Sequence, residues 1–145
     1  MKAMNLCEQF EQNCYLAKSI GAEKMVLHLW DGRTSDTAFH NNLHHYAALD
    51  QIAHNYDIDL CVENVVCTTD HPIKHFCAMR QHYPKIHFVF DTKMAAFHQQ
   101  LELLYEKEYE WLWKHEHICH YNLNDYAGGC MDWEHLQYLP IGKGT

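Results

Sequence analysis

Short apolar runs alternate along the whole chain with segments of helical periodicity. Four runs, at residues 24–29, 58–63, 85–91 and 116–123, have the length of strands and little polar alternation. Runs of this kind are typical of buried parallel strands, since helices cover the faces of such a sheet. We therefore predict four strands of a parallel sheet.

The segments between these runs place apolar residues three and four positions apart, as amphipathic helices do. We predict helices at residues 4–20, 41–56, 72–83 and 92–105, with a second helical piece at 109–115. Gly21 closes the first helix, and Asn41 or Asn42 caps the second. Pro72 suits the first turn of the third helix, and Pro84 ends it.

Strand and helix alternate four times without a linker or a change in composition, which indicates an α/β fold in one domain, residues 1–145. Right-handed crossovers would curve four such units into an open sheet or an arc of a barrel. A complete (β/α)8 TIM barrel needs about 250 residues. The chain supplies about half of that length, so its units form either an open sheet or a partial TIM barrel of about four βα units, a fragment that a missing segment or a second chain would complete.

Two carboxylates end successive apolar runs, Glu63 after the second and Asp91 after the third. The C-terminal ends of parallel strands meet at one rim of the sheet, where binding and catalysis collect. Carboxylates converging from different elements are typical ligands of divalent metals. We predict that Glu63 and Asp91 share an ion. The alternative is that each caps a helix or pairs with a lysine.

Two more side chains are candidate metal ligands. His28 lies in the first run, and its alternative role is that of a hydrogen-bonded core histidine. Asn122 lies near the end of the fourth run, and its amide oxygen could bind a metal or a sugar hydroxyl. His120 shares a face of that strand with Asn122, because residues two apart project the same way.

Further residues beside the rim could line a substrate pocket. The loop after the fourth run combines acids with aromatic rings, a combination that suits sugar hydroxyls and C–H faces. Its alternative role is a turn with a ring covering the end of the fold. The candidate substrate-binding residues are Trp30, Lys93, His120, Asp125, Tyr126, Asp132 and Trp133.

Composition narrows the function classes. The 11 basic and 19 acidic residues give a net charge of -8, which argues against nucleic acid and anionic membranes as partners. Seven cysteines without a CxxC pair indicate reduced thiols. With no signal peptide and no membrane-length apolar run, a cytoplasmic protein is expected. The absence of GxGxxG, GxxxxGK and GxSxG excludes dinucleotide, P-loop and serine-hydrolase sites.

The motif order GAEKMVLHLWDG, LCVENVV, FVFDTKMA, ICHYNLNDYAGGCMDW and LPIGKG resembles the xylose-isomerase-like TIM-barrel superfamily. That superfamily holds sugar phosphate isomerases and epimerases and also endonuclease IV. The resemblance implies a divalent Mn, Mg or Zn ion with Glu63 and Asp91 as ligands and His28 as a further ligand. Two family histidines are replaced, by Met94 after the third strand and by Asn122 on the fourth.

The function this resemblance implies is metal-assisted proton transfer next to a carbonyl in a sugar or sugar phosphate. Glu63 and a partner acid would exchange the proton, and Asp91 would chiefly hold the metal. One alternative is an endonuclease IV-like phosphodiesterase, which the net charge and the replaced histidines disfavour. Another is a catalytically inactive, sugar-binding half-barrel. Unpaired strand edges also predict self-association.

Overall fold

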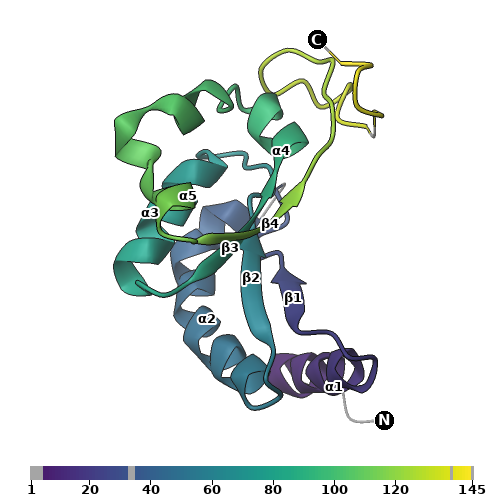
Figure 1. Ribbon diagram of the computed structural model, residues 1–145, viewed down its shortest axis with the longest axis vertical. Coiled ribbons are helices and arrows are strands. Elements are labelled where there is room, and N and C mark those ends of the chain that lie inside the picture. The colour runs from purple at the N-terminus through teal and green to yellow at the C-terminus, as the bar shows by residue number, and fades with distance from the viewer. Residues whose placement is uncertain (1–4, 33–34, 138, 145) are drawn as a thin grey trace.

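The sheet has the predicted parallel topology. The computed structural model describes residues 5–32, 35–137 and 139–144. Its four strands are β1 (Lys24–Leu27), β2 (Asp59–Glu63), β3 (His87–Asp91) and β4 (Ile118–Asn122). They form one sheet in the order β1-β2-β3-β4, and every neighbouring pair is parallel (Figure 1). The prediction of consecutive βα units is therefore confirmed.

Helices connect the strands on one side of the sheet. The α-helices are α1 (Leu6–Ser19), α2 (Phe39–His54), α3 (Pro72–His82), α4 (Thr92–Phe97) and α5 (Trp111–Lys114). Three short 3-10 helices lie at Ser35–Ala38, Glu102–Tyr105 and Lys107–Tyr109. In Figure 1, α1 crosses below the sheet, while α4 and the C-terminal loop lie at the end to which the strands point.

Two helix predictions were wrong. The segment 92–105 is not one helix, because α4 ends at Phe97 and the backbone of Gln99 turns into the left-handed region at φ 54°. Neither Asn41 nor Asn42 caps α2, which begins at Phe39. Asn42 lies inside that helix and donates its side-chain N–H to the Leu29 carbonyl, 2.9 Å away.

The core lies between the sheet and the helices α2 and α3. Alternate strand residues such as Leu60, Val62 and Phe88 are fully buried there, and the Phe88 ring stacks on Phe76 at a centroid distance of 3.9 Å. The residues between them project to the opposite face, because side chains alternate along a strand. That opposite face is called the inner face below. It carries the ionisable and metal-ligating residues Asp59, Cys61, Glu63, His87 and Asp91.

A buried carboxylate ties the loop after β2 to the loop after β1. Asp36 is 3% exposed and accepts four hydrogen bonds, from the backbone N–H and the hydroxyl of both Thr68 and Thr69, at 2.5 to 2.8 Å. Burial alone raises the pKa of Asp36, but these hydrogen bonds outweigh it and lower the pKa from 3.8 to about 2. The ionised form of Asp36 therefore holds the two loops together.

Asp36→Asn is expected to lower the free energy of unfolding at pH 7 by about 2 kcal/mol, because the variant amide donates toward groups that are themselves donors. A carboxylate whose pKa is lower in the folded than in the unfolded protein stabilises the fold at pH values above the unfolded pKa. This stabilisation is lost as the pH falls through the folded-state pKa. The difference in unfolding free energy between wild type and variant, measured by urea denaturation, should therefore decrease as the pH is lowered from 5 to about 2. The control Asp57→Asn, on an exposed carboxylate paired with Lys18, should change little. A gap independent of pH would contradict this role.

The two edge strands, β1 and β4, each pair with one neighbour among the described residues. Open edges of this kind can recruit further strands, and the expected self-association stays a prediction. None of the described helices has the length and apolar character needed to cross a membrane.

Candidate active site

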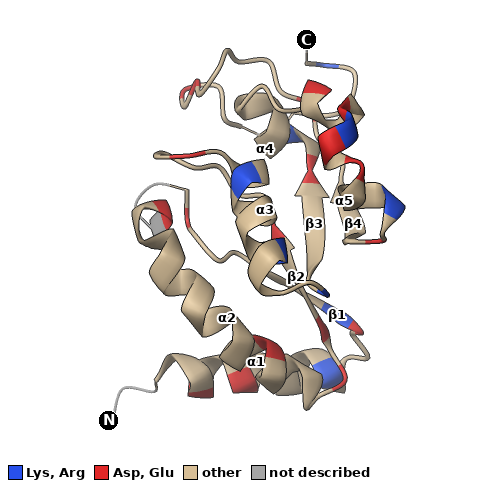
Figure 2. Ribbon diagram, turned by 90° about the vertical axis from the view of Figure 1, so that its left-hand side faces the viewer, with Lys and Arg blue, Asp and Glu red and all other residues tan. Residues whose placement is uncertain are grey.

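The C-terminal ends of β2, β3 and β4 bring the predicted polar side chains to one rim of the sheet. Asp91 pairs in register with Asn122, and Glu63 pairs with Val89, two residues before Asp91. In Figure 2, β3 points toward the α4 end of the molecule and ends in an acidic residue, and β2 runs parallel to it. Glu63 reaches across β3, so that its Oε1 accepts a hydrogen bond from Asn122 Nδ2 at 2.6 Å.

Glu63 and His28 form a close pair at this rim. The carboxylate Oε2 lies 2.6 Å from His28 Nε2, and the Glu63 side chain is nearly buried while that of His28 is largely exposed. The hydrogen bond from His28, assisted by Asn122, lowers the pKa of Glu63 despite burial. The same bond raises the pKa of His28. β1 ends at Leu27, so His28 is the first residue beyond the strand.

Asp91 is held by the start of α4. Its Oδ1 accepts hydrogen bonds from the backbone N–H groups of Lys93 and Met94, at 2.8 and 3.3 Å, and its Oδ2 accepts one from Asn124 Nδ2 at 3.1 Å. The helix-cap arrangement weighed from the sequence is therefore present. Burial nevertheless raises the pKa of Asp91, and the negative charge of Glu63 adds to the rise.

Sequence reasoning missed Asn64, which couples the ends of β2 and β3. The fully buried side chain of Asn64 accepts a hydrogen bond from the Asp91 N–H at 2.6 Å and donates one to the Asp91 carbonyl at 2.9 Å. An amide directly after a strand-ending acid was the available signal. Asn64 thus fixes the backbone of Asp91 relative to that of Glu63.

A cavity of about 490 Å³ lies beside His28, at the end of β1. Asn42, His45 and Asp31 contribute to its lining. Trp30 also borders it, but this ring is 1% exposed and its indole N–H donates to the Val65 carbonyl at 2.9 Å. Most of Trp30 therefore belongs to the core.

Lys93 and His120 differ in their burial. Lys93, in the first turn of α4, is half-buried, and its positive charge opposes the burial that raises the pKa of Asp91. His120 is exposed on β4, where it pairs in register with Val89. The positive charge of Lys93 acts on both Glu63 and Asp91.

Asp125 organises the end of the described chain. Its Oδ2 accepts hydrogen bonds from the backbone N–H groups of Gly142, Lys143 and Gly144, at 2.5 to 2.9 Å. These bonds lower the pKa of Asp125. The carboxylate that the sequence offered as a sugar ligand is thus engaged by a backbone turn.

The aromatic residues of the same loop pack on α4. Tyr126 is 6% exposed, and its hydroxyl donates to the Gly129 carbonyl at 2.7 Å. Trp133 meets Phe97 edge to face, with ring centroids 4.9 Å apart. Asp132 pairs with His135 Nδ1 at 2.6 Å. The turn-and-cover arrangement weighed from the sequence is the one present.

The rim has suitable donors for a divalent ion, with Glu63 at the centre. Its carboxylate touches an imidazole and an amide, a mixed oxygen and nitrogen set that suits Mn, Mg or Zn. Ring and carboxylate atoms of His28, Glu63 and Asp91 do not all lie within 4.8 Å of one another. Among the described residues, two other groups do: Asp36, Cys67 and His75, and Asp59, Cys61 and Cys119.

Comparison with known proteins identifies the fold of this chain. No protein-family model matches the chain, and no curated protein matches it. The structure is similar to the crystal structure of a xylose isomerase domain protein from Planctomyces limnophilus, with a TM-score of 0.66 and 14% identity. The match covers 96% of this chain and 50% of that chain, so this chain spans half its length. The similarity confirms the predicted fold, a partial α/β TIM barrel.

Proposed function

We propose that the chain belongs to a sugar or sugar phosphate isomerase or epimerase that transfers a proton at a carbon next to a carbonyl. One observation carries this proposal. Two nearly buried carboxylates, Glu63 and Asp91, share one rim, and their pKa values are displaced in opposite directions. Pairs of acids with separated pKa values are typical of sites where one group stays ionised and the other carries a proton.

The surroundings of the two carboxylates support a different role for each. The hydrogen bond from His28 favours the ionised form of Glu63, which makes this side chain the anion of the site. Burial favours the protonated form of Asp91 and makes it the better proton donor. Lys93 is placed to stabilise negative charge beside Asp91. This assignment gives Asp91 more of the proton transfer than the sequence alone suggested.

Glu63, His28 and Asn122 would hold the divalent metal, with Asp91 beside them. A bound ion of this kind supplies polarisation of the carbonyl and neighbouring hydroxyl oxygens. A cavity of about 490 Å³, within the usual range for small-molecule sites, borders His28, although neither Glu63 nor Asp91 lines it. The xylose isomerase domain protein with the same fold makes a sugar the first substrate class to test.

The test is proton exchange in heavy water. The chain is incubated with a panel of aldoses, ketoses and their phosphates, with Mn²⁺ or Mg²⁺ added. Deuterium incorporation at the carbon next to the carbonyl is followed by NMR. We expect exchange with at least one sugar, faster than with metal alone. Binding of a sugar without exchange would instead favour the inactive half-barrel, and nicking of abasic-site DNA would favour the endonuclease.

A further inference from the structure

The inner face of the sheet carries a second group of metal-ligating side chains, earlier on β2 and β4 than the residues of the rim. Asp59 and Cys61 lie on β2, and Cys119 lies on β4. One ligand atom from each of these three residues lies within 4.8 Å of the other two. The sulfurs of Cys61 and Cys119 are 2.6 Å apart, and Cys61 Sγ lies 3.7 Å from Asp59 Oδ2.

An irregularity in β4 brings the two thiols together across β3. Phe88 pairs with Ile118, but the next residue, Val89, pairs with His120, so Cys119 is an extra residue in β4. Such a bulge breaks the simple alternation of faces. Cys119 consequently shares the inner face with Asn122, three residues further on, and both reach side chains of β2.

We propose that Asp59, Cys61 and Cys119 form a zinc site on the inner face of the sheet, with His87 as the residue that holds the Asp59 carboxylate. Two sulfur ligands with a carboxylate are a donor set that favours Zn²⁺ over Mg²⁺ or Ca²⁺. This site is separate from the Glu63 rim and does not depend on the proposed function.

His87 supplies the outer contact that metal sites commonly have. It pairs in register with Cys61, and its Nδ1 lies 2.7 Å from Asp59 Oδ1. Residues that hydrogen-bond a metal ligand fix its orientation and raise affinity. On the other side, Lys24 Nζ donates to the Cys119 carbonyl at 3.1 Å and brings a positive charge beside the thiolates.

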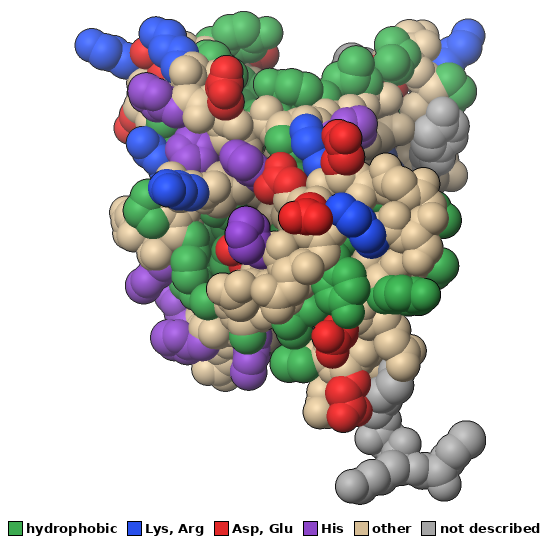
Figure 3. Space-filling model, turned by 60° about the horizontal axis from the view of Figure 1, so that its bottom comes forward, with side chains coloured by type: hydrophobic (Ala, Val, Ile, Leu, Met, Phe, Trp, Pro, Cys, Tyr) green, Lys and Arg blue, Asp and Glu red, His purple; other side chains and the backbone are tan. Residues whose placement is uncertain are grey.

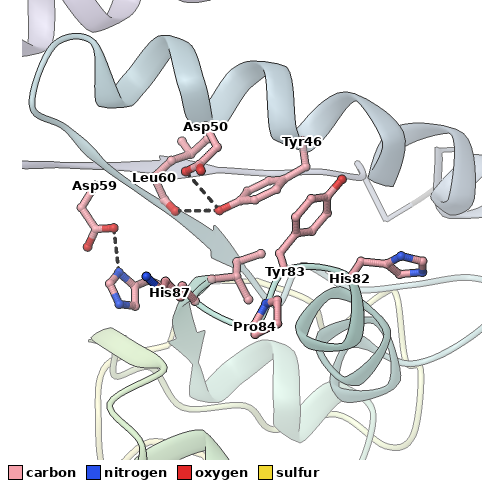
Figure 4. Close-up of a pocket in the computed structure, with 10 residues that line it drawn as sticks. Tyr46, Asp50, Asp59, Leu60, His82, Tyr83, Pro84 and His87 are labelled. Atoms are coloured by element: carbon pink, nitrogen blue, oxygen red, sulfur yellow. Dashed lines mark hydrogen bonds and ion pairs between the residues drawn. The ribbon is translucent and has the colours of Figure 1, made fainter.

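The site has a route to solvent. Asp59 and His87 lie at one end of a cavity of about 380 Å³, which the loop before β3 and the helix α2 also line (Figure 4). Their side chains are 35% and 41% exposed. The other candidate group, Asp36 with Cys67 and His75, is fully enclosed, and its carboxylate already accepts four hydrogen bonds.

The backbone separation of β2 and β4 argues against a disulfide between the two thiols. Neighbouring strands lie about 4.8 Å apart, so β2 and β4, with β3 between them, are about 9 to 10 Å apart before curvature. Disulfides need Cα atoms within about 7 Å. A zinc ion with two bonds to sulfur of about 2.3 Å keeps the sulfurs about 3.8 Å apart, so the two thiols, which lie 2.6 Å apart, would separate by about 1.2 Å to hold the ion.

The test uses Co²⁺ as a spectroscopic substitute for Zn²⁺ on the reduced, metal-stripped full chain. Histidines gather along one side of the face in Figure 3 and can bind metal weakly, so the readout is the charge-transfer absorption that arises only from thiolate ligands. We expect one equivalent of Co²⁺ to give this band and Zn²⁺ to remove it. The band should be lost in both Cys61→Ser and Cys119→Ser.

Three further variants separate this site from its competitors. His87→Ala should weaken binding by about 10- to 100-fold without removing the band. Cys67→Ser and Glu63→Gln should leave it unchanged, because neither residue belongs to the site. Circular dichroism of each variant verifies folding. The proposal is overturned if the wild-type chain gives no band, if Cys67→Ser abolishes it, or if peptide mapping finds a Cys61–Cys119 disulfide that persists with zinc present.

Discussion

Glu63→Gln is expected to slow the exchange of the sugar proton by about a hundredfold or more, the usual contribution of a general acid or base. Glutamine keeps the size of the side chain but cannot be ionised, so the close contact with His28 Nε2 loses its charge. Exchange rates measured by NMR in heavy water give the size of the loss. Sugar binding, followed by calorimetry, should change much less than the exchange rate.

The same variant has a second readout that does not depend on activity. The Glu63 hydrogen bond raises the pKa of His28, so Glu63→Gln should return the His28 titration toward its ordinary value of 6.5, as followed by the ring-proton NMR signals. The matched control is Glu106→Gln, an exposed acid away from the rim. If Glu63→Gln kept wild-type exchange while His28 titrated normally, Glu63 would have no part in the reaction.

Phe88→Ala is expected to lower the free energy of unfolding by about 3 to 5 kcal/mol, the usual range for removing a buried aromatic ring. Phe88 is fully buried on β3, stacks on Phe76 of α3, and meets the Trp111 ring edge to face at 6.2 Å. The ring therefore joins the sheet to two helices. Urea denaturation followed by circular dichroism measures the loss.

An aromatic residue on the surface gives the comparison for Phe88. Tyr105 is 85% exposed, so Tyr105→Ala should change the free energy of unfolding by less than about 0.5 kcal/mol. A Phe88→Ala effect of similar size to that of Tyr105→Ala would mean that the packing between the sheet and α3 contributes little to stability.

The sequence predicted the strands and their polar ends because both depend on local pattern. Each apolar run became a strand, and Glu63 and Asp91 lie where runs meet loops. The end of α4 was missed, since residues 92–105 have helical periodicity throughout. Nothing local marks the break near Gln99, where the backbone adopts a positive φ.

Long-range partners account for the rest of what sequence reasoning could not find. The turn that Asp125 holds lies 17 to 19 residues further along the chain. Cys61 and Cys119 are 58 residues apart, and they meet only because β4 gains an extra residue opposite β3. The spacing of these residues in the sequence does not indicate either contact.

The side chain of Asn64 works as one more rung of the ladder between β2 and β3, built from an amide where the backbone pairing stops. The interval between the two acids is thereby set by the covalent dimensions of a single asparagine. A descendant of this chain with leucine or glycine at position 64 could retain both carboxylates and still lose the fixed distance between them. A substitution at Asn64, as much as one at Glu63 or Asp91, could therefore alter or abolish the chemistry of the rim during evolution.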